Sequence, residues 1–210
     1  MRVLPFLLQW TTMMAAMMLP GVLPVARRYA RMVRNHRVLG LAAFGGGYLA
    51  VWAAAGVPGW LFGRALTQLA HAGGGALTAS AATITAGCGL YQLSSAKQHC
   101  LGQCRTPVSL LLRYASWTGR LRHLRVGLHH GLYCVACCWP LFLMLLLLAP
   151  ASVWAMVAVV VAVVAEKWAP RGDLVSRGVG ITFLAAAVVI VWWPRLVPGL
   201  AGGGMMEMGK

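Results

Sequence analysis

Residues 127–149 read GLHHGLYCVACCWPLFLMLLLLA, and this stretch decides the fold class of the chain. It carries no Asp, Glu, Lys or Arg, and its length is about what a helix rising roughly 1.5 Å per residue needs to cross the ~30 Å hydrocarbon layer of a membrane. Other apolar segments of similar character lie at 4–26, 38–62, 73–95, 151–168 and 174–193. The sequence therefore predicts an all-α, polytopic transmembrane helix bundle of about six spans, with residues 1–210 forming one integral membrane domain.

The composition disfavours both a soluble protein and a nucleic-acid-binding protein. The chain of 210 residues is 60% hydrophobic and has three acidic residues against eighteen Lys and Arg, a net charge of +15. A soluble domain of this size needs more charge on its surface. Basic clusters can neutralise phosphates, but here they occupy short loops between apolar segments, where the positive-inside rule and anionic lipid head groups account for them. We therefore expect membrane lipids, and no nucleic acid, as partners.

The basic residues are divided unequally between the two sides of the predicted bundle. Arg2, Arg64, Arg195 and Lys210 fall on one side. The other side holds the rest: Arg27, Arg28, Arg31, Arg34, Arg37, Lys97, Arg105, Arg113, Arg120, Arg122, Arg125, Lys167, Arg171 and Arg177. Because cytoplasmic loops carry the excess of Lys and Arg, we expect both termini outside the cytoplasm, in a multi-pass protein of the bacterial inner (plasma) membrane.

The first segment has an alternative interpretation as a secretory signal, because Arg2 precedes an apolar run. Gln9, Thr11 and Thr12 interrupt that run, no small-x-small cleavage motif follows it, and an arginine cluster comes next. These features favour a membrane span over a cleaved signal.

Residues 97–126 form the longest connection between predicted spans. Leu110, Tyr114 and Trp117 are among the apolar residues that interleave there with arginines. Such interleaving is typical of a helix that lies on an anionic leaflet. We therefore expect a basic amphipathic cytoplasmic loop.

The cysteines are confined to the third and fourth segments and the loop between them: Cys88, Cys100, Cys104, Cys134, Cys137 and Cys138. That loop is predicted to face the cytoplasm, a reducing compartment that disfavours permanent disulfides and favours metal binding or redox exchange. Cys88 has the simpler explanation of a small apolar residue that packs, because Gly87 and Gly89 beside it suggest close helix contact.

Four donor side chains enter the fourth segment on one helical face. At about 100° per residue, His130, Cys134, Cys137 and Cys138 fall within a stripe of roughly 100°. Thiolate and imidazole groups suit Cu(I) and Zn(II), whereas a hard ion prefers carboxylates, which the chain nearly lacks. The pattern predicts a site for a soft metal ion, with copper as Cu(I) expected first and zinc as the alternative.

Two further pairs of sulfur ligands are candidates for the same ion. Cys100 and Cys104 are spaced i to i+4, so they share a face if that stretch is helical. Met13 and Met17 have the same spacing near the middle of the first segment, and thioethers bind Cu(I) without losing a proton. Methionine is also an ordinary filler of helix cores, and this explanation stays open.

Glu166 and Lys167 adjoin at the cytoplasmic end of the fifth segment. A membrane-embedded carboxylate is costly unless it is paired, and we expect Lys167 and nearby arginines to pair with Glu166. No Ser-His-Asp, paired-carboxylate or HExxH arrangement occurs in the sequence. We therefore expect no hydrolase and, more generally, no enzymatic activity.

A resemblance to a known family rests on four stretches. They are WTTMMAAMMLP at 10–20, GLYQL at 89–93 continuing to Lys97 and CLGQCR at 100–105, HGLYCVACCW at 130–139, and Glu166-Lys167. Over most of its length the chain resembles the bacterial predicted metal-binding integral membrane proteins, a domain of unknown function linked to copper loading of polyphenol oxidases. The resemblance implies metal handling, with copper the usual expectation and no established enzymatic activity.

We therefore hypothesise a membrane-embedded protein that binds Cu(I) through Cys134, Cys137 and Cys138, with the other donors completing or relaying the site. It would deliver or chaperone copper to a cuproenzyme or a soluble metal carrier. The alternative is a membrane thiol-disulfide oxidoreductase in which Cys134 and Cys137 pass electrons through Cys100 and Cys104. A structural subunit whose cysteines only pack is a third hypothesis.

Overall fold

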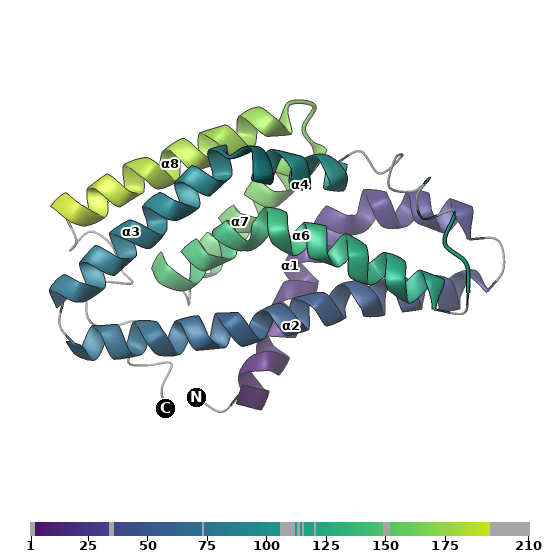
Figure 1. Ribbon diagram of the computed structural model, residues 1–210, viewed down its shortest axis with the longest axis horizontal. Helices are drawn as coiled ribbons and strands as arrows, with labels where there is room; N and C mark the ends of the chain where they lie inside the picture. Colours follow the sequence, from purple (N-terminus) through teal and green to yellow (C-terminus); the bar gives the residue numbers. More distant parts are fainter. Residues whose placement is uncertain are drawn as a thin grey trace.

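The computed structural model describes residues 3–33, 36–72, 74–105, 112, 114, 116–119, 121–148 and 152–193. Within these ranges the regular structure is helical throughout, which confirms the all-α fold class. The helices, shown in Figure 1, are α1 (Val3–Met32), α2 (Arg37–Ala72), α3 (Gly74–Leu93), α4 (Ser95–Arg105), α6 (Arg122–Leu148), α7 (Val153–Trp168) and α8 (Gly172–Trp192).

Four helices among the described residues are long and apolar enough to cross a membrane: α1, α2, α6 and α8. The six spans expected from the sequence are therefore not confirmed, because α3 and α7 are not among the four. α7 has 16 residues, and a helix of that length is only about 24 Å long, shorter than the ~30 Å hydrocarbon layer. The part of the prediction that is not confirmed is thus the pair α3 and α7.

Glycines let α2 and α6 pack with their backbones in contact, side by side along the molecule (Figure 1). A Cβ atom at Gly47 would lie 2.5 Å from the carbonyl oxygen of Leu124, and one at Gly127 would overlap the carbonyl oxygen of Phe44. Small residues are the usual means by which helices approach closely in membranes. The contact fixes where α6, the helix with three cysteines, sits against α2.

α3 and α8 form a second close pair, in which Gly89 and Gly180 face each other. A Cβ atom at Gly89 would lie 2.9 Å from the carbonyl oxygen of Gly180. Cys88 is buried in an apolar cluster together with Leu66 and Ile190. Its surroundings agree with the packing explanation that the neighbouring glycines suggested.

The main apolar core joins α1, α2, α6 and α7 around the remaining buried cysteines. The indole nitrogen of Trp10 in α1 donates a hydrogen bond to the carbonyl oxygen of Trp52 in α2, at 2.9 Å. Both rings contact Phe142 of α6. These contacts fix the point at which α1 crosses α2 and α6. The second half of α1 then lies beside the end of α7 (Figure 1).

Candidate metal centre

The cysteines of α6 lie where a proline opens the hydrogen-bond ladder of the helix. Pro140 has no amide proton, so the carbonyl group of Ala136, four residues earlier, lacks its partner within the helix. The hydroxyl group of Tyr91 in α3 donates to this oxygen at 2.7 Å. The ammonium group of Lys97 in α4 donates to the carbonyl oxygen of Cys137. Both neighbouring helices are thus attached to α6 beside its thiols.

Cys134, Cys137 and Cys138 are fully buried. The sulfur of Cys137 lies 3.3 Å from that of Cys138, and it also lies 3.3 Å from the carbonyl oxygen of Cys134. All six cysteines fall within the described residues, and all are free thiols. The one-face stripe predicted from the spacing is therefore turned into the interior of the bundle.

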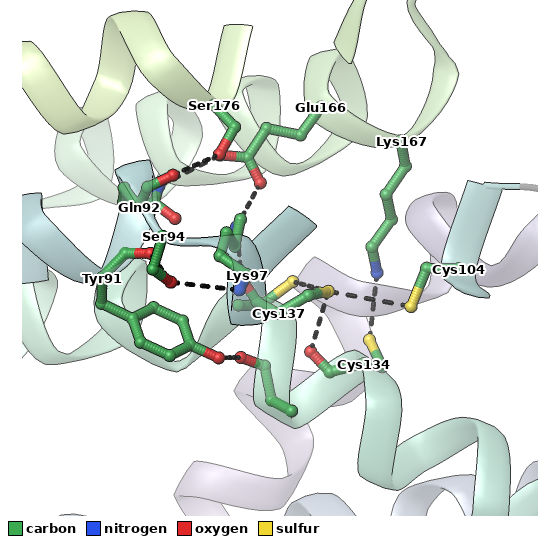
Figure 2. A network of polar contacts seen from close by, with 12 residues as sticks. Tyr91, Gln92, Ser94, Lys97, Cys104, Cys134, Cys137, Glu166, Lys167 and Ser176 are labelled. Atoms are coloured by element: carbon green, nitrogen blue, oxygen red, sulfur yellow. Dashed lines mark hydrogen bonds and ion pairs between the residues drawn. The ribbon is translucent and has the colours of Figure 1, made fainter. Parts of the chain in front are cut away.

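α4 brings a fourth buried thiol to this group. The sulfur of Cys104 lies 3.7 Å from the sulfur of Cys137, as Figure 2 shows. Cys100, one turn earlier in α4, is half-buried and packs against the same apolar core. Burial raises the pKa of the Cys100 thiol, while the positive charge of Lys97 acts in the opposite direction. The structure therefore brings Cys104 into sulfur contact with the α6 cysteines, and the metal-binding role of Cys100 and Cys104 stays a prediction.

Lys167 does not pair with Glu166, contrary to the expectation from the sequence. Its ammonium nitrogen lies 3.0 Å from the sulfur of Cys134, and the hydroxyl group of Tyr48 in α2 lies 3.0 Å from the same sulfur. Adjacent residues of a helix point about 100° apart, so Glu166 and Lys167 face different neighbours. The sulfur of Cys134 therefore has one ammonium group and one hydroxyl group beside it, and both can donate a hydrogen bond to sulfur.

Glu166 pairs instead with Lys97, at 2.7 Å between carboxylate oxygen and ammonium nitrogen, with both side chains buried. The side-chain amide of Gln92 donates to the other carboxylate oxygen at 3.1 Å. Burial by itself lowers the pKa of Lys97, but the charge of Glu166 and of the nearby cysteines more than offsets this, and the pKa lies above its ordinary value. Lys97, assigned from the sequence to an amphipathic surface loop, therefore lies in the interior as a charged group.

The other predicted ligands lie near the thiols without a direct contact that defines their role. His130 is buried one turn before Cys134; its ring stacks with that of Tyr48, and its Nδ1 has no hydrogen-bond partner among the described residues. Met17 is buried in the apolar core that contains the three α6 cysteines, and Met13 packs at the edge of this core. The roles of His130, Met13 and Met17 as metal ligands remain predictions.

The thiols are close together but are not yet arranged as a metal site. In the described ranges, no group of three or more His, Cys, Asp or Glu side chains has a geometry ready to hold a metal ion. The chemistry of the group nevertheless suits a soft ion, because four buried thiols meet beside one cationic group in the interior. A change of side-chain rotamers would be needed to direct the sulfurs to one point.

Two residues at this site escaped the sequence reasoning. Tyr48 is the hydroxyl neighbour of Cys134, yet nothing around it in α2 signals a polar role. Lys97 lies within one of the stretches that carried the family resemblance, and a single lysine three residues before Cys100 was the available signal. Its burial follows from contacts with α6 and α7 that lie far away in sequence.

Comparison with known families gives one match. Residues 7–190 match the PpoB2 family, which is described as copper chaperone. The match spans every cysteine of the chain, together with Lys97, Glu166 and Lys167. No curated protein and no solved structure matches the chain.

Proposed function

The chain belongs to the PpoB2 family of copper chaperones, and from this premise we propose that it binds Cu(I) through buried cysteine thiolates and delivers it to a cuproenzyme. The observation that carries the proposal is the meeting of two helices at sulfur: Cys104 of α4 lies 3.7 Å from Cys137 of α6, which lies 3.3 Å from Cys138. Cargo that bridged these sulfurs would join α4 to α6.

The sulfur positions need only a small change to hold an ion. Metal–sulfur bonds of about 2.3 Å, the length found for zinc thiolates, place three sulfurs around one ion about 4 Å from each other. The sulfur pairs of Cys137 with Cys104 and with Cys138 are slightly closer than this. Rotation about the side-chain bonds of Cys104 and Cys138 would open the group to that spacing.

The family match supports copper over zinc as the cargo, and two features of the cysteine cluster suit a soft ion such as Cu(I). Among the described residues no carboxylate lies within the cluster of cysteine thiols, because Glu166 pairs with Lys97. Three thiolates around Cu(I) carry a net charge of −2, and the Lys167 ammonium group beside Cys134 offsets part of it. Cys100, His130, Met13 and Met17 are the residues we propose as relay ligands on the way to or from this site. Zinc remains the alternative cargo.

We further propose that the protein is embedded in the bacterial inner membrane with the thiol group at its cytoplasmic side and both termini outside. α1, α2, α6 and α8 are long and apolar enough to span, and α3 and α7 are the two additional spans of the six-span hypothesis. The loops rich in Lys and Arg adjoin α4 and the starts of α6 and α8. The positive-inside rule places that end in the cytoplasm, where copper is reduced and bound by thiols.

Measurement of Cu(I) binding to the purified protein tests the proposal. The wild-type protein in detergent, under reducing conditions, should retain Cu(I) against a chromogenic competitor, and Cys104→Ser should weaken binding at least tenfold because a hydroxyl is a poor ligand for a soft ion. Cys88→Ser is the matched control, since Cys88 is buried in a separate apolar cluster. Equal copper binding by Cys104→Ser and wild type would refute the proposed site.

The thiol-disulfide oxidoreductase stays as a second candidate because Cys104 and Cys137 belong to different helices and their sulfurs are in contact. Formation of a disulfide there would link α4 to α6. An oxidoreductase needs only a pair of thiols, whereas the proposed copper site uses Cys138 as well. Loss of copper binding in Cys138→Ser, with no thiol exchange in the wild type, would exclude the redox candidate.

A further inference from the structure

A pocket of about 290 Å³ opens between the second half of α1, the end of α4 and the end of α7. We call it the access pocket; its lining includes Gly21, Arg28, Cys104, Arg105, Lys167 and Trp168. A neighbouring pocket of about 320 Å³ shares Arg105, Lys167 and Trp168 with it. The volume lies at the lower end of the range of about 300–1,000 Å³ that small-molecule sites occupy.

The lining of the access pocket is strongly positive. Arg28, Arg105 and Lys167 contribute three cationic groups, and no acidic side chain is among the described residues that line it. Asp173 is the nearest counter-charge, 4.0 Å from Arg105 and half-exposed, while Glu166 is turned toward Lys97 on the other face of α7. Among the described residues one half-exposed carboxylate therefore stands against three cationic groups, and the pocket lining keeps a net positive charge.

Two lining residues of the access pocket also contact the α6 cysteines. Cys104 lines the pocket and touches Cys137. Lys167 lines it and reaches Cys134, as the arrangement in Figure 2 shows. A Cβ atom at Gly21 would already lie 3.5 Å from the Lys167 side chain, so a larger residue there would take up pocket space. Cys104 is thus the sulfur that joins the pocket to the buried site.

We propose that copper passes through the access pocket as an anionic Cu(I) complex of a small thiol that carries carboxylates. The inference rests on the proposed copper function and adds the form in which the ion arrives. A bare Cu(I) cation would be repelled by three positive groups, whereas an anionic complex is attracted and its carboxylates can pair with the arginines.

The transfer is a ligand exchange without a change of oxidation state. The Cys104 sulfur bonds to Cu(I) as one copper–sulfur bond of the small thiol breaks, and the Cys104 proton moves to the departing thiolate. Cys137, 3.7 Å away, then becomes the next sulfur ligand, and its proton leaves with the second thiol of the complex. Cu(I) stays Cu(I) throughout.

Stopped-flow measurement of the rate of Cu(I) transfer to the protein in neutral detergent tests the proposed route. Two donors are compared: Cu(I) bound by excess glutathione, an anionic complex, and Cu(I) in acetonitrile, a cationic complex. Arg28→Glu reverses one exposed charge of the pocket, and Arg27→Glu, also exposed on α1 but outside the pocket lining, is the matched control. At low ionic strength Arg28→Glu should slow transfer from glutathione about tenfold, within the range of electrostatic steering. Transfer from acetonitrile should not slow.

The difference between the two arginine variants should shrink at about 1 M salt, where the screening length is only about 3 Å. Equal rates from glutathione for Arg28→Glu and Arg27→Glu would overturn the proposal, as would an equal slowing with both donors. Gly21→Leu, which narrows the pocket without changing charge, should slow the larger glutathione complex more than the acetonitrile complex. Absence of transfer to the wild type from either donor would instead contradict the copper function itself.

Discussion

The sulfur of Cys134 shows how single residues set the chemistry of the site. A lysine of α7 and a tyrosine hydroxyl of α2 both lie 3.0 Å from it. Charge-assisted hydrogen bonds are roughly twice as strong as neutral ones, so the contact with the lysine is the stronger of the two. Cys137 and Cys138, by contrast, have sulfur as their nearest side-chain neighbours. The α6 thiols are therefore chemically unequal although they share one helix face.

Substitution of the single residue Cys138 distinguishes copper binding from thiol exchange. We predict that Cys138→Ser weakens Cu(I) binding about as much as Cys134→Ser does, by tenfold or more, because a site that takes its ligands from Cys104 and the three α6 cysteines loses a sulfur in either case. Competition with a Cu(I) chelator measures both variants. Maturation of a copper-dependent oxidase should fail in cells carrying Cys138→Ser and recover with excess copper. Wild-type binding by Cys138→Ser would contradict a copper site that includes Cys138.

At the scale of elements, the buried ion pair between Lys97 and Glu166 attaches α4 to α7. We predict that Glu166→Ala lowers the free energy of unfolding by about 3–5 kcal/mol, because it leaves a buried ammonium group without its partner. The double variant Lys97→Met/Glu166→Leu should recover most of this loss, since it removes both charges. Thermal unfolding in detergent compares the three proteins.

Asp173 provides the control for this experiment. It lies 4.0 Å from Arg105 and is half-exposed, and exposed ion pairs contribute about 0–1 kcal/mol. Asp173→Ala should therefore change the free energy of unfolding little. A double variant as unstable as Glu166→Ala would show that packing, not charge, holds α4 in place.

The contact between α2 and α6 gives a second test of an element interface. A Cβ atom at Gly127 would overlap the carbonyl oxygen of Phe44, whereas one at Gly46 meets nothing within 4 Å. We predict that Gly127→Ala destabilises the protein by about 1–3 kcal/mol through overpacking, and that Gly46→Ala is neutral or stabilising. Unfolding midpoints in detergent distinguish the two, and equal midpoints would place α2 and α6 further apart.

For the whole molecule, the number of spans can be decided with reporters fused at internal positions. If α3 and α7 cross the membrane, a reporter after Gly119 lies in the cytoplasm and one after Ser152 lies outside. If only α1, α2, α6 and α8 cross, both locations are reversed, provided that the amino terminus is outside. We predict the six-span result, because the basic residues of the 97–126 connection favour the cytoplasm.

A fusion at Lys210 checks the orientation independently of α3 and α7. Both span counts are even, so the carboxyl terminus should share the side of the amino terminus, and only a periplasmic reporter should be active there. Activity of a cytoplasmic reporter at Lys210 would refute the predicted orientation.

The sequence by itself determined the helical class and the grouping of the cysteines, and it predicted copper as the cargo. Long uncharged segments leave a chain little choice but helix, because backbone polar groups must then bond within their own segment. The spacing of Cys134, Cys137 and Cys138 puts them on one face of any helix. These properties depend on neighbours within a few residues, and the family match agrees with the copper assignment.

Only the tertiary structure decided the partners of the charged groups. Glu166 and Lys167 are adjacent in sequence, yet one meets Lys97 and the other meets Cys134. The same holds for Tyr48 beside Cys134 and for Cys104 beside Cys137, pairs that are 86 and 33 residues apart. A hydrogen bond or a sulfur contact requires an approach within 3–4 Å, and such distances follow from how the glycines and the proline let whole helices pack.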